Sequence, residues 1–388
     1  MKVACVGGGP ASLYFSILMK RADPSHEITV YERNPAGSTY GWGVTYWDEL
    51  LRSLHGADPE SASAISENSV RWDNWVVHLH DHPKVNLEQT DEGYGIGRRE
   101  LLAILAERAR SLGVRIEYDR EITVEDDLAD ADLVAACDGV TSVLRERHAD
   151  HFGTRVTVGR NMYTWLGTTK IFDAFTFAFV RTDHGWIWCY GYGFGKEHST
   201  CVVECSPATW KGLGLDQANE EHGLAILEKL FADLLEGHSL IGRARWQNFP
   251  TVTNRTWHRD NLVLLGDAAH TTHYSIGAGT ALALGDAAFL VDALHSEPYL
   301  ETALSRYERQ RMPSIRSTQK AARNSARWYE NLSRYINLPP SQMCVLLGQR
   351  HSPVLPHIPP RLYYLVDQTA EWFASKAIRP PKESPDHA

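Results

Sequence analysis

The sequence predicts an α/β composite: a domain built on a parallel sheet, an inserted domain built on a mostly antiparallel sheet, and C-terminal helices. Three observations indicate this. A strand–glycine–helix–strand pattern opens the chain at residues 1–34. Strand-like segments rich in Thr, Val, Phe, Trp and Tyr fill residues 155–205. Helical patterns dominate the chain beyond residue 300.

The strands of the parallel sheet recur far apart in the sequence, which makes the first domain discontinuous. We expect that domain in residues 1–70, 95–155 and 250–300, and the inserted substrate-binding domain in residues 71–94 and 156–249. A helical region follows at 301–377, and the Pro-containing tail 378–388 is predicted to be disordered.

Composition excludes several classes of protein. A chain of 388 residues with 43% hydrophobic and 22% charged residues is globular and can bury a large core. A net charge of -9 argues against general nucleic-acid binding, and no apolar run reaches the length of a membrane span. The first strand begins at once and leaves no room for a signal peptide, and the six cysteines have no metal-type spacing. We expect reduced, buried cysteines and a cytoplasmic protein.

The first βαβ unit is the most informative stretch. Gly7 and Gly9 follow an apolar strand and let the backbone turn sharply and approach a ligand closely. The next helix directs its free N–H groups at that ligand, which favours a pyrophosphate, and Glu32 closes the second strand where a ribose would lie. Ser12 replaces the third glycine of the G-x-G-x-x-G pattern. The pattern predicts a Rossmann-like dinucleotide site, with an ordinary βαβ turn as the alternative.

The following elements are less specific. We expect a glycine-rich aromatic loop at residues 37–47, which could cover a flat ring, and a polar helix at 57–69. His78, His80 and His82 alternate as on one face of a strand; metal binding is conceivable, but solvated histidines are favoured and no metal site is predicted. Arg98 opens an amphipathic helix that Gly113 ends.

Later segments continue the pattern. We expect buried strands at 133–137 and 262–265, each followed by a Gly–Asp or Asp–Gly turn, and helices at 220–235, 277–294 and 361–377. The helix that begins at a glycine pair near Gly277 offers a second anion- or carbonyl-binding N-terminus.

Three motifs in order, "GGGPAS", "CDGVTSVLR" and "GDAAHTTHYSIGAGTALALGDA", resemble those of single-component FAD-dependent aromatic hydroxylases related to p-hydroxybenzoate hydroxylase. Within that family, "GWGV", "IGRREL", "GRNMYTWLGTTKIFDAFTF", "VVECS" and "ARNSARWYEN" are similar to salicylyl-CoA 5-hydroxylase and to the flavin domain of 2-aminobenzoyl-CoA monooxygenase. The violacein-pathway hydroxylase of a tryptophan derivative is a more distant match. The resemblance covers the chain to about Leu338.

The resemblance implies non-covalent FAD, with NADH or NADPH as a transient reductant. It assigns the pyrophosphate to Gly7, Gly9 and Ser12, the ribose to Glu32 and the FAD linker to Arg98. Asp138 and Gly139 would lie near the FAD and the passing nicotinamide, Asp267 at the ribityl or phosphate portion, and the 277–279 segment at the ring. The full predicted cofactor set is Gly7, Gly9, Pro10, Ala11, Ser12, Glu32, Arg33, Gly43, Val44, Arg98, Asp138, Gly139, Gly266, Asp267, Gly277, Ala278, Gly279 and Thr280.

The implied reaction is hydroxylation of an aromatic ring by O2 through a flavin C4a-hydroperoxide, with salicylyl-CoA or a related CoA or carrier thioester as substrate. His270, His273 and Tyr163 are the candidates for assisting a phenol, each with a structural hydrogen bond as the alternative. A tryptophan-type substrate, an FAD-dependent reductase and a flavin-binding protein without turnover are the alternative functions.

A basic stripe is the candidate for holding the phosphates of CoA. Arg316, Lys320, Arg323 and Arg327 recur at helical spacing and share one face of a predicted helix. Guanidinium groups suit phosphate through paired N–H donors. A solvated basic face is the alternative interpretation of the same spacing.

Overall fold

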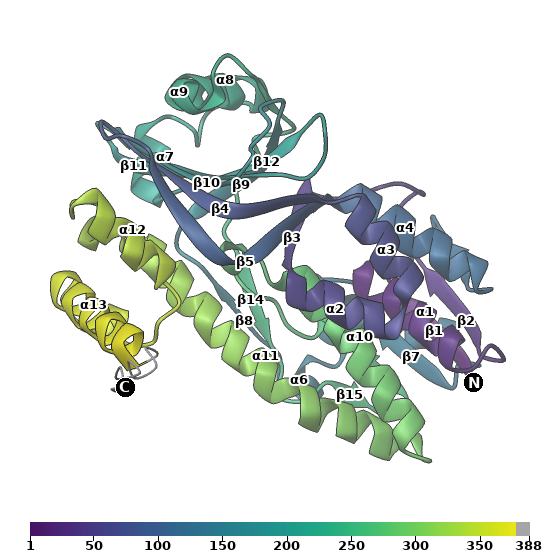
Figure 1. Cartoon of the computed structure of the whole chain (residues 1–388). Helices are drawn as coiled ribbons and strands as arrows, with labels where there is room; N and C mark the ends of the chain where they lie inside the picture. Colours follow the sequence, from purple (N-terminus) through teal and green to yellow (C-terminus); the bar gives the residue numbers. More distant parts are fainter. Residues whose placement is uncertain (378–388) are drawn as a thin grey trace, which may run out of the picture.

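The computed structural model describes residues 1–377, with the side chains of all except 88–91, 125–126 and 369–377. The predicted disordered tail 378–388 lies outside the described residues. Two sheets lie side by side, and one long helix, α11 (Leu300–Glu330), runs diagonally past both of them (Figure 1). The predicted α/β architecture is confirmed.

The first sheet has six strands in the order β15-β16-β7-β1-β2-β6. All neighbours pair in parallel except the edge pair β15–β16. The strands are β1 (Lys2–Val6), β2 (Glu27–Tyr31), β6 (Arg115–Glu117), β7 (Leu133–Ala136), β15 (His258–Arg259) and β16 (Leu262–Leu264). β1 lies between β2 and β7. The chain first builds β2 and β6 on one side of β1 and later returns to place β7 and β16 on the other, which opens a crevice at the carboxyl ends of the strands.

Helices cover this sheet because their apolar faces complete its core. Leu13, Phe15 and Ile17 of α1 (Pro10–Ala22) are buried with the residues of β1 and β7. α4 (Arg98–Ser111) and α10 (Gly279–Ser296) contribute to the same core, as do Leu304 and Tyr307 of α11. The short helices nearby are α2 (Asp48–Ala57), α3 (Pro59–Glu67), α5 (Val143–Arg147) and α6 (Ala149–Phe152).

The second sheet has eight strands in the order β13-β9-β12-β11-β10-β4-β5-β3. It is mostly antiparallel, as predicted, with β10 and β4 as the parallel pair. Its strands are β3 (Gly43–Trp47), β4 (Val70–Leu79), β5 (Val85–Gly97), β9 (Met162–Thr168), β10 (Phe175–Thr182), β11 (Gly185–Gly193), β12 (Ser199–Cys205) and β13 (Leu240–Ile241). A separate two-stranded ribbon joins β8 (Arg155–Val158) to β14 (Pro250–Thr253).

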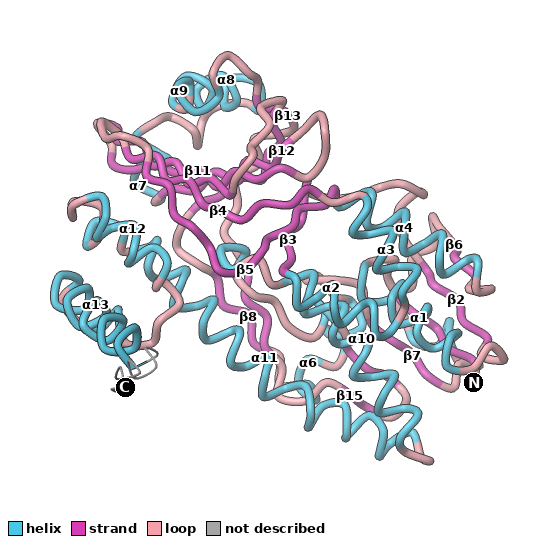
Figure 2. Tube along the Cα trace, viewed as in Figure 1, coloured by secondary structure: helices cyan, strands magenta, loops and turns pink. Residues whose placement is uncertain are grey.

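Both faces of the eight-stranded sheet are packed, which explains its long apolar segments. On one face, Leu227 and Phe231 pack against Cys189 and Val203. The helices on this face are α7 (Pro207–Gly212), α8 (Glu220–Leu230) and α9 (Ala232–Leu235). On the other, Trp328 of α11 and Met343 of α12 (Pro340–Gly348) join an aromatic core. Figure 2 shows α8 and α9 on one side of this sheet and α12 on the other, with α13 (Pro360–Ala377) beside α12.

Several predicted elements differ in the structure. Residues 43–47, expected as loop, form β3, because they pair antiparallel with residues 93–97 of β5. α10 begins at Gly279 because Gly277 adopts a φ of 63°, outside the helix. His78 lies near the end of β4, whereas His80 and His82 lie beyond the strand, so the three histidines do not share a strand face. The predicted helix at 220–235 is divided at Phe231 into α8 and α9.

Other predictions are confirmed. The helices expected at 57–69 and 361–377 are present as α3 and α13, and the strands expected at 133–137 and 262–265 are β7 and β16. The six cysteines are free and buried. Within the described residues, no helix is long and apolar enough to cross a membrane. The domain boundaries stay a prediction.

Candidate active site

A cavity of about 1000 Å³ lies where the two sheets meet. Residues one to three positions beyond the ends of four parallel strands line it: Gly7 after β1, Glu32 after β2, Asp138 after β7 and Asp267 after β16. The carboxyl ends of parallel strands share one edge of a sheet, and this edge is the usual ligand site of such folds. We call this part of the cavity the nucleotide end.

Gly7 and Gly9 are glycines for different structural reasons. Gly7 has a φ of 100°, and a Cβ there would overlap the carbonyl oxygen of Cys137. Gly9 is the N-cap of α1, and a Cβ there would meet no atom within 4 Å. Gly7 is therefore required by the protein's own packing, whereas the space beside Gly9 is open for a ligand at the helix N-terminus.

Glu32 is held on the cavity wall by its neighbours. One carboxylate oxygen accepts the N–H of Gly8 at 2.6 Å, and the other accepts the backbone N–H of Asn34 at 2.8 Å and its side-chain amide at 2.6 Å. These bonds fix the carboxylate beside the glycine turn. The carboxylate can still accept a ligand hydroxyl, because an ionised carboxylate offers about four lone-pair positions.

Arg98 and Asp267 both line the nucleotide end, and each charge influences the pKa of the other. Burial lowers the pKa of Arg98, and the nearby carboxylates of Asp267 and Glu32 act in the opposite direction. Desolvation raises the pKa of Asp267, although His270 and Arg98 oppose it. The Asp267 side chain is nevertheless accessible through the cavity. Both groups are thus available to a polar ligand.

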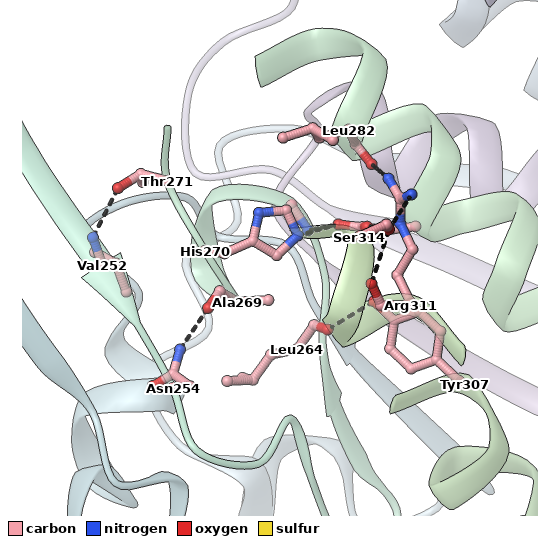
Figure 3. Close-up of polar contacts among 12 residues, drawn as sticks. Val252, Asn254, Leu264, Ala269, His270, Thr271, Leu282, Tyr307, Arg311 and Ser314 are labelled. Atoms are coloured by element: carbon pink, nitrogen blue, oxygen red, sulfur yellow. Dashed lines mark hydrogen bonds and ion pairs between the residues drawn. The ribbon is translucent and has the colours of Figure 1, made fainter. Parts of the chain in front are cut away.

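A buried polar network fixes the turn that carries Asp267. Asp286 of α10 accepts hydrogen bonds from the N–H of Gly266 at 3.0 Å and Nε of Arg311 at 2.8 Å, and it pairs with Nε2 of His270 at 2.8 Å. Arg311 also donates to the carbonyl of Leu282. His270 and Arg311 converge on this network (Figure 3). Burial would raise the pKa of Asp286, but His270 and Arg311 outweigh it and hold that pKa below its usual range.

The opposite part of the cavity, which we call the aromatic end, is lined by rings from distant elements. The wall consists of Trp75, Tyr163, Trp165, Phe175, Tyr190, Tyr192, Phe249 and Tyr274, with Gln247 and Arg350 as polar members. Phe175 stacks on Tyr192 with ring centroids 5.5 Å apart, and Arg350 lies over Trp75. Such a wall suits a flat aromatic ligand.

A buried carboxylate lies behind this wall. Glu204 of β12 is 1% exposed and accepts hydrogen bonds from the hydroxyls of Tyr190 and Tyr274, each at 2.7 Å. Asn161 donates to its other oxygen at 2.7 Å. Desolvation raises the pKa of Glu204, and the three donors counteract this. The sequence contained a signal for this residue, because a glutamate interrupts the apolar segment 201–205.

Most of the predicted site residues line the large cavity. These are Gly7, Gly9, Pro10, Ala11, Glu32, Arg33, Gly43, Val44, Arg98, Asp138, Gly139, Tyr163, Gly266, Asp267, Gly277, Ala278, Gly279 and Thr280. Ser12 is fully buried within α1 and does not line it. Sequence reasoning did not select the aromatic residues other than Tyr163, nor Gln247, Glu204 and Arg350, because they come from segments far apart in the chain.

The two histidine candidates lie outside the large cavity. His270 belongs to the Asp286 network, and His273 is 8% exposed and contacts Ser275 at 2.9 Å. Desolvation lowers the pKa of His273 to about 3, so its imidazole is neutral near pH 7.

His273 lines a second, smaller cavity of about 190 Å³. Phe249, Thr271 and Thr272 line both cavities, so the two are neighbours. Arg323 and Arg327 of the basic stripe line the smaller cavity, whereas Arg316 and Lys320 do not. The four stripe residues are exposed and form no ion pair within the described part of the chain.

Comparison with known proteins decides the family. A model of the FAD binding domain family matches residues 1–322. The chain is 36% identical to 3-hydroxy-4-methyl-anthranilyl-[aryl-carrier protein] 5-monooxygenase of Streptosporangium sibiricum, over 86% of this chain and 90% of that protein. It is 31% identical to protodeoxyviolaceinate monooxygenase of Chromobacterium violaceum, over 87% and 91%. The chain belongs to the FAD-dependent aromatic hydroxylases.

A third relative of this enzyme is salicyloyl-CoA 5-hydroxylase of a Streptomyces species, 37% identical over 87% of the chain. The chain spans 66% of that relative's length, slightly less than two thirds. Among solved structures, 2-methyl-3-hydroxypyridine-5-carboxylic acid oxygenase has the same fold, with a TM-score of 0.71 at 19% identity, covering 90% of this chain and 96% of that one.

The residues of the nucleotide end fit FAD. The open space beside Gly9 lies at the N-terminus of α1, where a pyrophosphate is favoured, and Glu32 and Asp267 offer carboxylates along the same cavity. Gly139 and Gly279 line the cavity as well, and a Cβ at either would meet no atom within 4 Å. The donor set and the open backbone together match an elongated dinucleotide.

Proposed function

We propose that this enzyme hydroxylates the ring of an aryl thioester, of the salicylyl-CoA type or its carrier-protein equivalent, with NAD(P)H and O2. One observation supports the substrate class above the others: two relatives of more than 35% identity have names that place the aryl group on CoA or an aryl-carrier protein. The aromatic end of the cavity offers a wall of rings against which such a group can pack.

The nucleotide end would hold the cofactor. Gly7, Gly9 and the N-terminus of α1 would take the pyrophosphate, Glu32 the ribose and Asp267 the ribityl portion. Bound FAD would accept a hydride from NAD(P)H and allow O2 to supply the oxygen atom that is added to the ring. The chain's own contribution is to orient the ring, exclude water and supply hydrogen bonds.

Tyr163 is the best supported of the three catalytic candidates. It lines the cavity, and its hydroxyl accepts a hydrogen bond from Gln247 at 2.9 Å, which leaves its own hydrogen without an acceptor among the described residues. That hydrogen can be donated to a substrate oxygen. His273 suits the role of base poorly, because a group with a pKa of about 3 does not hold a phenol's proton near pH 7.

The small cavity beside the basic stripe supports a place for the thioester's phosphates. Arg323 and Arg327 line it, and its other wall is shared with the aromatic end through Phe249 and Thr272. A substrate with its ring in the large cavity and its phosphates at the stripe would cross this shared wall. We further propose a cytoplasmic location, which the free, buried cysteines support because they fit a reducing compartment.

A substrate screen tests the proposal. We expect salicyl or aminobenzoyl thioesters to stimulate NADH or NADPH oxidation by the FAD-loaded enzyme, with O2 consumed and product mass increased by one oxygen. A tryptophan-type substrate that alone stimulates turnover would replace the thioester. Stimulated turnover without O2 would indicate a reductase, and no stimulation by any aromatic compound would indicate a binding protein.

A further inference from the structure

Glu204 and its three hydrogen-bond donors, Asn161, Tyr190 and Tyr274, form a buried polar cluster that packing alone does not require. Glu204 is a carboxylate at 1% exposure that forms no ion pair within the described residues, and neutral donors surround it instead. Burying an unpaired charge is costly. A cluster with that cost is expected to have a use, and two of its donors, Tyr190 and Tyr274, line the aromatic end of the large cavity.

Hydrogen-bond directions determine what the two tyrosines offer. Tyr190 and Tyr274 both donate their hydroxyl hydrogens to the same oxygen of Glu204. Tyr190 already accepts from Nε1 of Trp188 at 3.0 Å. Tyr274 accepts from no group among the described residues, so its hydroxyl presents only lone pairs to a ligand. The hydroxyl of Tyr274 is thereby fixed as an acceptor.

Tyr163 provides the complementary group. Its ring lies 4.6 Å from that of Tyr274, between centroids, and its hydroxyl hydrogen has no acceptor in the described part of the chain. The wall therefore carries a donor and an acceptor on two neighbouring rings. A matching ligand has a hydrogen-bond donor close to an oxygen acceptor.

We propose that Glu204 is a positioning residue that fixes Tyr274 as the acceptor for a ring hydroxyl or amino group, so that the cavity selects aryl substrates carrying such a donor beside their carbonyl. This inference rests on the proposed function for the carbonyl and defines the substrate class further. Tyr163 donates to the carbonyl oxygen, and Tyr274 accepts from the adjacent O–H or N–H. A benzoyl group without the donor leaves the Tyr274 acceptor unpaired.

The test compares ligands that differ in one hydroxyl. Oxidised, FAD-loaded enzyme is titrated without NAD(P)H, and the change in flavin absorbance reports binding. The first pair of ligands is the N-acetylcysteamine thioesters of salicylate and benzoate, and the second pair is salicylamide and benzamide. We expect wild-type enzyme to bind the hydroxyl-bearing member of each pair about tenfold more tightly. Equal affinity within both pairs would overturn the proposal.

The variants separate positioning from a merely structural role. In Tyr274→Phe and Glu204→Leu, the two members of each pair should bind with about equal affinity, because the acceptor that distinguishes them is lost or no longer fixed. Glu204→Gln should retain the preference, because its amide oxygen can accept from both tyrosines and its NH2 group can face a reversed Asn161 amide. A preference that survives Tyr274→Phe, or is lost in Glu204→Gln, would overturn the proposal.

Tyr329→Phe is the matched control. The ring of Tyr329 packs edge-on against that of Tyr190, with centroids 5.2 Å apart, but Tyr329 does not line the cavity. Removing the Tyr329 hydroxyl should therefore leave the preference for hydroxyl-bearing ligands unchanged. If Glu204→Leu fails to load FAD, Tyr274→Phe decides alone. Failure of the proposed function has a different signature. The amides then show the hydroxyl preference, while the thioesters bind no more tightly than the amides and are not hydroxylated.

Discussion

The two ends of the cavity are built in different ways. The nucleotide end depends on short segments that directly follow parallel strands, and Gly7, Gly9 and Glu32 come from one βαβ unit. The aromatic end is assembled from β4, β9, β10, β11 and the segments around residues 249, 274 and 350. The difference indicates that the nucleotide end is encoded in short local segments, whereas the aromatic end depends on how the second sheet and the C-terminal helices pack.

The largest expected effect is at the Asp286 network, which supports the nucleotide end from behind. Asp286→Ala leaves Arg311 and His270 buried without their carboxylate, so we expect a loss of about 3–5 kcal/mol of unfolding free energy. Chemical denaturation measures it. An effect below about 1 kcal/mol would contradict the supporting role.

The same network predicts a pH dependence. Because its folded pKa is lowered, Asp286 contributes stability above its unfolded pKa of about 4, and that contribution is lost as the pH falls through the folded value. The stability difference between wild-type enzyme and Asp286→Asn should therefore shrink over the interval that starts at about pH 5 and extends down through the lowered folded pKa. A difference that does not change over this interval would contradict the assignment.

Gly7 and Gly9 form a matched pair for separating fold from ligand. Gly7→Ala should destabilise the apoprotein by about 2–3 kcal/mol, since φ is 100° and the Cβ would overlap Cys137. Gly9→Ala should leave the apoprotein stable but weaken FAD binding, because its Cβ would enter open space at the helix N-terminus. Thermal unfolding of the apoproteins and FAD titration measure the two effects; equal behaviour of both variants would remove the distinction.

Glu32 tests whether the nucleotide end acts independently of the aromatic end. Glu32→Ala should weaken FAD binding by about 1–3 kcal/mol, because a ribose hydroxyl loses a charged acceptor. Once the variant is saturated with FAD, the affinity for an aryl ligand should equal that of wild type. Unchanged FAD affinity would exclude Glu32 from the cofactor site, and a changed aryl affinity would show that the ends are coupled.

The basic stripe tests how far the substrate site extends beyond the rings. Arg323→Ala with Arg327→Ala should raise KM for a CoA thioester about three- to tenfold at low salt, because exposed charge pairs are individually weak. Added salt should reduce this difference by screening, and an N-acetylcysteamine thioester should show none. Lys229→Ala with Arg309→Ala, exposed cations that line neither cavity, is the control. Equal KM values for both double variants would locate the phosphates elsewhere.

The smallest effect is expected at Tyr163. Tyr163→Phe removes one hydrogen-bond donor from the aromatic wall, which corresponds to a two- to tenfold lower affinity for an aryl thioester, or about 0.5–1.5 kcal/mol. FAD binding should not change, since Tyr163 belongs to the other end of the cavity. Isothermal titration with salicylamide, without NAD(P)H, gives the affinity for the aryl group. Loss of FAD in this variant would contradict the division of the cavity into two ends.

The sequence by itself determined the parallel sheet, the dinucleotide turn and the family. Each strand, turn and motif on which they rest is a short local segment, in which strand, glycine and helix patterns directly reflect backbone geometry. It also predicted that residues 155–205 form a mostly antiparallel sheet, because strand propensity is visible segment by segment.

Tertiary structure alone decided which side chains meet. Residues 43–47 form a strand only because β5 lies beside them, and Glu204 meets Tyr274 across 70 positions of sequence. Tertiary packing also moved His270 into the Asp286 network and away from the cavity. The physical reason is that hydrogen bonds and ring contacts depend on distance in space, and the packing of two sheets and α11 brings distant segments together.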